Sequence, residues 1–236
     1  MDRAEWDELA EKFEELVVDV TADETSDQVT RFVAAARLPK SAVLVDLGCG
    51  IGSFIHRFGD RFAEIDGVEH APKIIARAKA KCAGIENVHW HTLDVARAAK
   101  RLQGRADLTV CMNVITSETA AERAAQWAGL RAVTKPGGFA LVVVPSLESE
   151  RMVQRHTPRP KNGKPTLTAD GLADKAGSWQ KHYRRDELTA LLARHGFQVK
   201  RMGRIYSPWS REGLRKPRNP AFKSPWDWIC LAQRTA

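Results

Sequence analysis

The chain has 236 residues, 43% of them apolar, which is enough for one α/β domain with a sizeable core. No run of 18 or more apolar residues occurs, so no membrane span is expected, and four scattered cysteines predict neither a disulfide framework nor a metal site. The net charge of +8 is uneven: residues 151–225 hold 18 Lys and Arg against 5 Asp and Glu, whereas residues 1–150 hold 18 against 23. This asymmetry suggests an acidic partner, either nucleic acid, an anionic small molecule or another protein, with a solvated basic surface as the alternative.

Two amphipathic helices are predicted before the first strand. Trp6, Leu9, Phe13 and Leu16 recur at three- and four-residue steps, which indicates one face of a helix, and a second helix is expected over residues 27–36. The acidic, amphipathic start is typical of neither a signal peptide nor a transit peptide, so we expect a cytoplasmic protein.

The pattern then alternates between buried strands and helices. Five strands are predicted, over residues 42–48, 63–69, 87–94, 106–115 and 139–146. Three helices are expected between them, from residue 54 onward, over 72–83 and over 118–133. Alternating units of this kind favour a doubly wound, mostly parallel sheet.

The last third of the chain begins differently. Residues 150–180 contain three prolines and many basic residues, and predict a long, partly irregular excursion. Order is expected to return with a helix over 184–196, followed by strands over 196–206 and 226–233.

The segment VLVDLGCGIG, residues 43–52, predicts a strand that runs into a glycine loop at the carboxyl edge of the sheet. Gly48 and Gly50 let the backbone approach a ligand, and the following helix N-terminus favours a carboxylate or phosphate. A dinucleotide fingerprint would need glycine in place of Ser53 and an apolar residue in place of Asp46. A ligand with both a cation and a carboxylate fits better, and the methionine part of S-adenosylmethionine is such a ligand.

Two further acids end predicted strands. Glu69 closes the second strand, where it is placed to accept hydrogen bonds from both ribose hydroxyls of such a ligand. Asp94 closes the third strand, where it is placed to accept from the adenine amino group. The alternatives are a surface acid for Glu69 and a helix N-cap for Asp94.

Four segments resemble the class I S-adenosylmethionine-dependent methyltransferases: VDLGCGIGSF, the acid in GVEHAP, the LDV after the third strand and the KPGG before the fifth. The resemblance covers residues 43–146. It implies a Rossmann-like methyltransferase fold, α/β and doubly wound, with a seven-stranded, mostly parallel sheet, N-terminal helices and a basic, lid-like insertion. It also implies methyltransferase activity with S-adenosylmethionine as the cofactor.

We expect a single domain over residues 1–236. Its parts are N-terminal helices at residues 1–38, a cofactor-binding half at 39–146 and a substrate-side half at 147–236.

The resemblance assigns the cofactor site residue by residue. Asp46 and the loop glycines form the first motif, Glu69 holds the ribose, Asp94 holds the adenine, and Asn113 lies beside the methionyl group. The cofactor-binding residues that we predict are Asp46, Gly48, Cys49, Gly50, Gly52, Glu69, His70, Asp94, Val95 and Asn113. Within this set Cys49 is expected to be a small packing residue and not a nucleophile.

No catalytic residue is predicted. Methyl transfer needs mainly the alignment of nucleophile, methyl and sulfur, and a general base only if the acceptor arrives protonated. Polar residues near the expected site are candidates with a structural role as the alternative; they are Ser146, Glu148, Glu150, His182 and Tyr183.

The connection before the last strand is expected beside the acceptor. In the family's topology the sixth strand is parallel and the seventh antiparallel, so residues 207–228 emerge at the carboxyl face. Trp209, Arg211 and Arg215 are therefore predicted to bind a small, anionic or aromatic acceptor, the alternative being a basic surface loop.

Two other functions remain open. An RNA methyltransferase would use the basic C-terminal half, but the fourth strand ends in NVITSE and not in the (D/N/S)-P-P-(Y/F) motif of nucleic-acid amino-methyltransferases. A binding protein without catalysis would have kept the cofactor fold, but the presence of Asp46, Glu69 and Asp94 argues against it.

Overall fold

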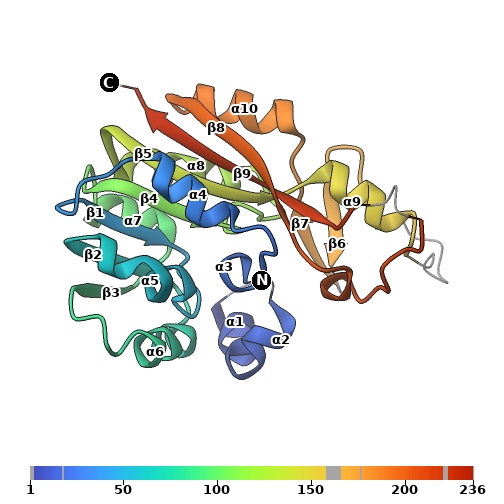
Figure 1. Cartoon of the computed structure of the whole chain (residues 1–236), viewed down its shortest axis with the longest axis horizontal. Coiled ribbons are helices and arrows are strands. Elements are labelled where there is room, and N and C mark those ends of the chain that lie inside the picture. The colour runs from blue at the N-terminus through green and yellow to red at the C-terminus, as the bar shows by residue number, and fades with distance from the viewer. Residues whose placement is uncertain (1–2, 18, 158–165, 176, 220–222, 236) are drawn as a thin grey trace.

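The computed structural model describes residues 3–17, 19–157, 166–175, 177–219 and 223–235. Its centre is a seven-stranded sheet with strand order β3-β2-β1-β4-β5-β9-β8 (Figure 1). The strands of this sheet are β1 (Val43–Leu47), β2 (Glu64–Glu69), β3 (Val88–Thr92), β4 (Ala106–Met112), β5 (Thr134–Pro145), β8 (Phe197–Tyr206) and β9 (Trp226–Arg234). A separate two-stranded sheet pairs β6 (Leu172–Lys175) with β7 (Ser178–Lys181).

Helices connect the strands in the alternation that the sequence predicts. The α-helices are α1 (Arg3–Leu9), α2 (Phe13–Leu16), α3 (Val20–Asp23), α4 (Gln28–Ala35), α5 (Ser53–Phe58), α6 (Pro72–Lys81), α7 (Val95–Arg101), α8 (Ala120–Val133), α9 (Leu147–Gln154) and α10 (Arg185–Arg194). Short 3₁₀ helices are η1 (Ala10–Lys12), η2 (Gly59–Arg61) and η3 (Trp209–Glu212). None of the helices in the described parts of the chain is long and apolar enough to cross a membrane.

The sheet confirms the predicted doubly wound topology. Strands β1 to β5 are parallel, and β9 pairs antiparallel with both β5 and β8, so that β8 runs parallel to β5. The strand order reverses between β1 and β4. Leu47 at the end of β1 is in register with Val68 of β2 and Cys111 of β4, so the loops that follow these strands emerge side by side. Ligands of open parallel sheets bind at such a switch point.

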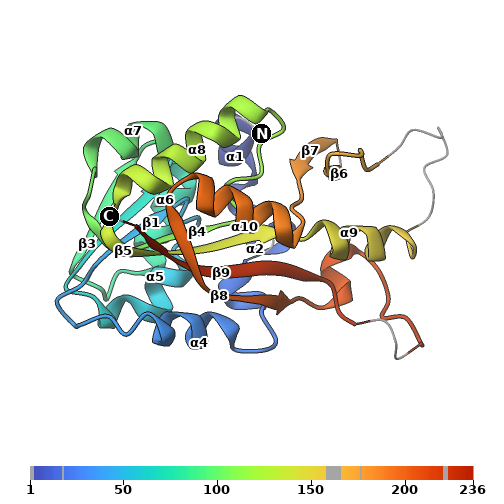
Figure 2. The ribbon, with the colours of Figure 1, turned by 90° about the horizontal axis from the view of Figure 1, so that it is seen from above.

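Helices cover both faces of the sheet (Figure 2). Phe32 of α4 and Ile55 of α5 pack with Leu44 on one face, whereas Trp127 of α8 packs with Val45 on the other. Leu44 and Val45 are neighbours in β1, and consecutive side chains of a strand point to opposite faces. The almost continuous apolar composition of the central strands follows from burial on both faces.

The predicted N-terminal helix is interrupted. Residues 3–16 form α1, the 3₁₀ turn η1 and α2, and not one continuous helix. Arg77 of α6 donates to the carbonyl of Ala10 at the interruption, and the turn places Phe13 over the glycine loop, where its ring packs with Ile51. The expectation of one continuous amphipathic helix was wrong, and Arg77 contacts the chain at the point where the helix is interrupted.

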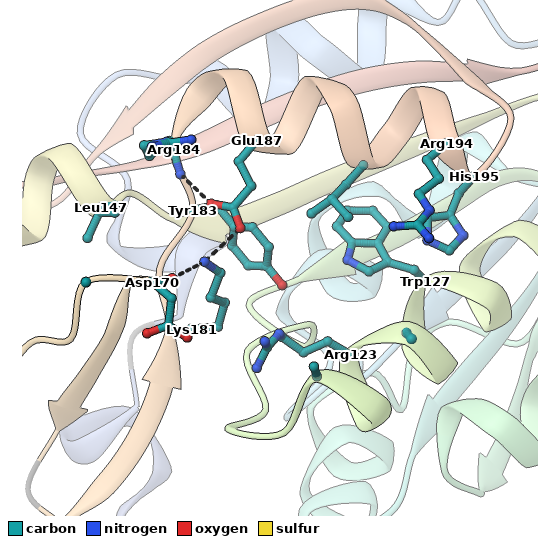
Figure 3. A pocket seen from close by; sticks show the side chains of 14 residues that line it. Arg123, Trp127, Leu147, Asp170, Lys181, Tyr183, Arg184, Glu187, Arg194 and His195 are labelled. Carbon is teal, nitrogen blue, oxygen red and sulfur yellow. Dashed lines mark hydrogen bonds and ion pairs between the residues drawn. The ribbon is translucent and has the colours of Figure 1, made fainter.

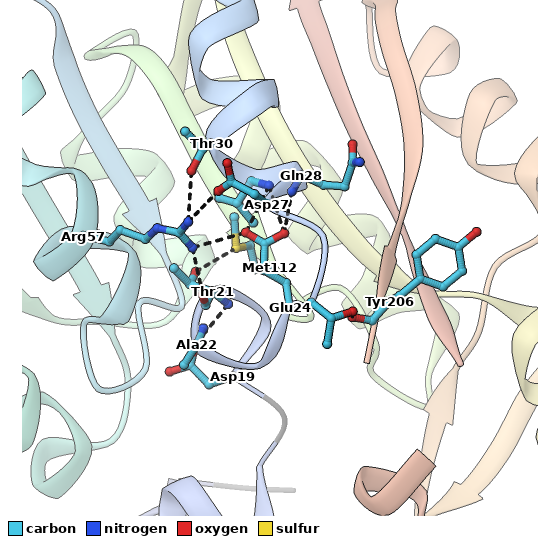
Figure 4. A network of polar contacts seen from close by, with 12 residues as sticks. Asp19, Thr21, Ala22, Glu24, Asp27, Gln28, Thr30, Arg57, Met112 and Tyr206 are labelled. Atoms are coloured by element: carbon cyan, nitrogen blue, oxygen red, sulfur yellow. Dashed lines mark hydrogen bonds and ion pairs between the residues drawn. The ribbon is translucent and has the colours of Figure 1, made fainter. Parts of the chain in front are cut away.

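The segment after this helix is fixed by a polar network (Figure 4). Arg57 of α5 donates to the carbonyl of Thr21 at 3.1 Å, and pairs with Glu24 at 3.2 Å and with Asp27 at 2.7 Å. Glu24 also accepts from the backbone N–H of Gln28 at 2.7 Å, at the start of α4. These contacts hold the segment around α3 against α5, beside the carboxyl edge of the sheet.

The predicted excursion over residues 150–180 contains regular structure that the sequence did not indicate. It begins within α9 and continues, outside residues 158–165, into the β6–β7 hairpin. The backbone N–H of Lys181 in β7 donates to the carbonyl of Thr116 at 2.8 Å. This bond brings β7 next to the loop that follows β4.

Candidate functional site

A cavity of about 800 Å³ lies at the carboxyl ends of the parallel strands. Its walls come from the loop after β1, the ends of β2 and β3, the segment between β4 and α8, the N-terminal residues and β7. Nine of the ten residues predicted to bind the cofactor line it: Asp46, Gly48, Cys49, Gly50, Glu69, His70, Asp94, Val95 and Asn113. The tenth, Gly52, packs against α6 instead, where a Cβ would lie 3.3 Å from that of Ala78.

The glycine loop lies close to its neighbours because its glycines adopt left-handed backbone angles. Gly48 has φ +70°, and a Cβ at this position would overlap the side chain of Val114. Gly50 has φ +52°, and a Cβ there would lie 3.0 Å from the ring of Phe13. The backbone N–H groups of Gly48 and Cys49 both donate to the carbonyl of Val68, at 2.8 and 2.9 Å, which ties the loop to β2. The Cys49 thiol is buried, and burial raises its pKa, in keeping with a packing residue.

Asp46 is a buried carboxyl at the base of the cavity. Only 3% of the residue is exposed, and its Oδ2 atom has no hydrogen-bond partner within the described residues. Burial raises its pKa to about 8, and the nearby carboxylates of Asp19 and Glu69 add to the shift. A buried carboxylate without a countercharge is costly, so this position is suited to a ligand that brings a cation.

Glu69 is held at the end of β2 by its own backbone. Its Oε1 accepts from the N–H of His70 at 2.7 Å and of Ala71 at 3.0 Å, and lies 2.8 Å from Nδ1 of His70. The hydrogen bond to Glu69 raises the pKa of His70 against the effect of burial. All these contacts fall on Oε1, so Oε2 of Glu69, a residue that lines the cavity, is available to other donors. The carboxylate is thereby oriented for a second set of donors.

Asp94 and Val95 lie where β3 gives way to α7. Asp94 is the N-cap of α7 and accepts from the N–H of Arg97 at 2.8 Å. The helix-cap role offered as the alternative to adenine binding is therefore present. It occupies Oδ1, and Oδ2 lies 3.4 Å from Nε of Arg97. A cap that also lines the cavity can serve both purposes.

Asn113 follows β4 in a left-handed conformation, with φ +54°. Its Nδ2 donates to Oδ2 of Asp227 at the start of β9, at 3.0 Å. Burial raises the pKa of Asp227 to about 6. The Oδ1 atom of Asn113 is buried and has no partner in the described part of the chain. The amide is thus oriented by Asp227, and its Oδ1 atom is free to accept from a ligand in the cavity that Asn113 lines.

The three residues predicted to bind the acceptor are not among those that line the cavity. Trp209 is 3% exposed and meets His156 edge-on, with ring centroids 5.4 Å apart. Arg211 pairs with Asp23 at 2.5 Å and donates to the carbonyl of Glu14 at 2.9 Å. Arg215 is exposed. The 207–228 connection does lie at the carboxyl end of β5, where Pro145 is in register with Asp227, but Trp209 and Arg211 contact other residues there and Arg215 is exposed.

The other candidates form structural contacts. Ser146 caps α9 by accepting from the N–H of Ser149 at 3.1 Å, and the hydroxyl of Tyr183 donates to the carbonyl of Ile115 at 2.7 Å. Burial lowers the pKa of His182 to about 4, with Glu150 partly opposing this shift. Glu148, close to the same segment, accepts from Nε1 of Trp228 at 3.2 Å. None of these side chains lines the cavity as described.

Residues that the sequence did not single out line the rest of the cavity. Phe13 and Asp19 come from the N-terminal segment, Gln126 comes from α8, and Trp179 and Gln180 come from β7. Periodicity could have indicated Phe13, since it belongs to an amphipathic face. For Trp179 there was no signal, because β7 is a short, polar strand in a segment that reads as irregular.

A second cavity of about 580 Å³ lies between α8, α10 and β7 (Figure 3). Trp127 stacks there on His195 with centroids 5.9 Å apart, and Lys181 pairs with Glu187 at 2.7 Å. Gln180 lines the first cavity and Lys181 the second, as expected for consecutive side chains of one strand. None of the residues predicted to bind cofactor or acceptor lines the second cavity.

Among the described residues, no group of three or more His, Cys, Asp and Glu could hold a metal ion.

Comparisons with solved structures show the same fold in methyltransferases. The 1,6-didemethyltoxoflavin-N1-methyltransferase of Burkholderia thailandensis, solved with its namesake ligand and S-adenosylhomocysteine, is 16% identical, with a TM-score of 0.66 over 99% of this chain and 87% of that one. The magnesium protoporphyrin IX methyltransferase of Synechocystis PCC 6803, solved with S-adenosylmethionine, is 16% identical, with a TM-score of 0.64 over 100% and 98%. An S-adenosylmethionine-dependent methyltransferase from Mesorhizobium loti is 19% identical, with a TM-score of 0.61 over 89% and 99%.

The sequence itself gives a family match. A search of curated proteins finds no significant relative. Residues 44–138, which span β1 to the start of the apolar part of β5, match the family model described as a methyltransferase domain. The match includes the glycine loop and the ends of β2, β3 and β4, which meet at the first cavity. Residues 44–138 therefore match a methyltransferase domain, and the chain has the fold of S-adenosylmethionine-dependent methyltransferases.

Proposed function

We propose that the protein transfers the methyl group of S-adenosylmethionine to a small-molecule acceptor by direct displacement, within the cavity at the carboxyl ends of the strands. The observation that carries this proposal is the unpaired, buried Oδ2 of Asp46 beside a loop in which a Cβ at Gly48 or Gly50 would meet a neighbour. These features fit a ligand that has a cation and comes close to the backbone. We propose a single domain, with the cofactor-binding half at residues 39–146 and the substrate-side half at 147–236.

Residues at the ends of three strands would each hold a different part of the cofactor. Asp46 would pair with the ammonium group, Oε2 of Glu69 would accept from the ribose hydroxyls, and Asp94 would accept from the adenine amino group. Asn113 would lie beside the methionyl part. When bound, the cofactor supplies an electrophilic methyl group on a positively charged sulfur.

The task of the protein in this reaction is orientation and exclusion of water. Phe13 covers the glycine loop, where its ring lies 3.0 Å from the position of a Cβ on Gly50, and Trp179 of β7 forms another part of the cavity wall. Holding two reactants in line can lower a barrier by about 7–11 kcal/mol, which suffices without a dedicated catalytic side chain. The small-molecule acceptors named for the Burkholderia and Synechocystis proteins support an acceptor of this size.

An RNA acceptor is the second candidate. It is favoured by exposed cations on α9, at its C-cap and on the connection before β9, namely Arg151, Arg155, Arg215, Lys216 and Arg218. They are not part of the cavity lining. An RNA acceptor would therefore have to bind on this outer surface and extend a base into the cavity.

Calorimetry and a labelling screen test the proposal. We expect S-adenosylmethionine and S-adenosylhomocysteine to bind and NAD not to bind. A screen of small molecules and RNA with methyl-labelled cofactor should then label a small molecule. Binding of NAD alone would end the proposal. Labelled RNA with no labelled small molecule would replace it with the second candidate, and cofactor binding without labelling of any acceptor would favour a non-catalytic protein.

A further inference from the structure

The cavity is acidic, although the protein is basic. The chain has a net charge of +8, yet no Lys or Arg occurs among the described residues that line the cavity. Seven carboxyl groups do line it: Glu5, Asp19, Asp46, Glu69, Asp94, Glu118 and Glu122. The cations that produce the excess charge therefore lie elsewhere, and the ionised carboxylates of the cavity favour a ligand that carries positive charge.

The cofactor accounts for only part of this acidity. The proposed function uses Asp46, Glu69 and Asp94 for the cofactor, whose ammonium, sulfonium and carboxylate leave it with one net positive charge. Glu118, in the segment before α8, and Glu122, in its first turn, are not used by that assignment. No hydrogen bond or ion pair of either carboxylate occurs within the described residues. The nearest arginine in the chain, Arg123, is directed at the carbonyls of Ser117 and Glu118, at 2.7 and 2.6 Å.

An unpaired acceptor atom lies beside these two acids. Nε2 of Gln126 donates to Oγ of Ser117 at 3.0 Å, which fixes the direction of the amide. Its Oε1 atom is buried and has no partner among the residues that the structure describes. A buried carbonyl oxygen favours a donor, so a ligand N–H group would satisfy it.

An aromatic side chain completes this part of the cavity. Trp179 of β7 lines it together with Ser178 and Gln180. The bond from Lys181 to Thr116 holds β7 beside the segment that carries Ser117 and Glu118. The face of an indole ring attracts cations and packs against planar groups.

We propose that the acceptor is a small molecule with a protonated amine and a planar or apolar body, bound between Trp179 and the carboxylates of Glu118 and Glu122. This inference rests on the proposed function and specifies its substrate class. It replaces the anionic acceptor that the net charge led us to expect, because the basic residues of the 207–228 connection do not line the cavity. The carboxylates that line the cavity also attract cationic substrates and repel anions.

Matched ligands test the charge preference. The enzyme saturated with S-adenosylhomocysteine is titrated calorimetrically with phenethylamine, 2-phenylethanol and 3-phenylpropanoate, and with tryptamine, tryptophol and indole-3-propanoate. Within each set the ring is constant, and the end group is a cationic amine, a neutral alcohol or an anionic carboxylate. We expect the amine to bind at least tenfold more tightly than the carboxylate, with an affinity that falls as salt is raised.

Three results would overturn the inference: a carboxylate that binds as tightly as its amine, an alcohol that binds more tightly than its amine, or a complex with S-adenosylhomocysteine that binds none of the six compounds. Failure of S-adenosylhomocysteine itself to bind would instead overturn the proposed function, so the two failures are distinguishable.

Single variants test the assignment to residues. Glu118→Gln and Glu122→Gln should each weaken amine binding by about two- to fivefold, the range of exposed ion pairs, while affinity for the alcohol changes by less than twofold. Glu86→Gln is the matched control, because Glu86 is an exposed carboxylate that does not line the cavity. It should change the affinity for neither the amine nor the alcohol. Binding of S-adenosylhomocysteine verifies that each variant is folded. Unchanged amine affinity in both cavity variants would overturn the assignment.

Discussion

The Nζ atom of Lys175 lies 2.6 Å from the carboxylate of Glu150, and this pair joins the β6–β7 hairpin to α9. Glu150 is almost fully buried, and Nε2 of His182 approaches the same carboxylate at 3.5 Å. Burial opposes the charge of Lys175, but Glu212 and Glu150 together raise its pKa above its ordinary value. Among the described residues of the β6–β7 hairpin only Ala173 is a buried apolar residue, so charged groups contribute to holding the hairpin against α9.

Lys175→Met should destabilise the protein by about 1–3 kcal/mol, because Glu150 would remain buried without its principal countercharge. The double variant Lys175→Met, Glu150→Gln should be more stable than the single variant, since the stranded charge is gone. Denaturant unfolding followed by tryptophan fluorescence measures both. Lys100→Met, at an exposed lysine of α7, is the control and should change stability by less than about 0.5 kcal/mol. A single variant as stable as wild type would show that the pair contributes nothing.

The sequence predicted the sheet well because buried parallel strands have a distinctive composition. Segments such as ADLTVCM in β4 are apolar on both faces, and the glycine loop and the acids that end β2 and β3 fall at fixed places relative to them. Strand ends and the family resemblance together therefore indicated nine residues of the cofactor half that line the cavity.

The acceptor side was not predictable in the same way. The net charge led us to predict that Arg211 and Arg215 bind the acceptor. Net charge does not show which cations are already paired within the protein, and Arg211 is paired with Asp23. Trp179 reaches the cavity from a hairpin and Gln126 from the middle of α8, and their positions depend on tertiary contacts such as that of Lys181 with Thr116. Local pattern carries no record of such contacts.

Cofactor binding should release a proton from Asp46. With a pKa of about 8, raised by burial and by Asp19 and Glu69, this carboxyl is mostly protonated at pH 7 in the free protein. An ammonium ligand pairs with the ionised form, so affinity for S-adenosylhomocysteine should rise between pH 6 and 8, by up to about tenfold per unit. The pKa is raised above its unfolded value of 3.8, so the free energy of unfolding of the free protein should fall as pH rises through the same region.

Calorimetry in two buffers of different ionisation enthalpy measures that proton. About one proton should be released per ligand at pH 7 in wild type. Asp46→Asn should bind more weakly and release none, and His70→Asn separates the contribution of the neighbouring histidine. Identical heats in both buffers for the wild-type protein would mean that Asp46 is already ionised.

Glu69→Ala should weaken binding of S-adenosylhomocysteine by about tenfold or more. The change removes Oε2 from the proposed ribose site and also the Oε1 atom that orders the backbone of His70 and Ala71. Each hydrogen bond to a charged group contributes about 1.5–3 kcal/mol. Glu69→Gln keeps one acceptor oxygen, so its affinity for S-adenosylhomocysteine should lie between those of wild type and Glu69→Ala. Glu86→Ala serves as a control. A folded Glu69→Ala protein with unchanged affinity would remove β2 from the cofactor site.

Arg211 should matter for the N-terminal segment, whereas Arg215 should not. Arg211 joins the connection before β9 to Asp23 and to the carbonyl of Glu14, so it holds down the segment that supplies Phe13 and Asp19 to the cavity. Arg211→Ala should therefore increase amide hydrogen exchange of residues 3–17 and 19–24 and weaken cofactor binding by several-fold, the effect of losing one partly buried ion pair.

Arg215→Ala is the matched control, because Arg215 is exposed in the same connection and does not line the cavity. It should leave both exchange and cofactor affinity at the wild-type level. Equal effects of the two variants would point to the charge of the connection as a whole. An effect confined to Arg211 would show that this basic segment acts through one contact, by fastening the N-terminal helices over the site.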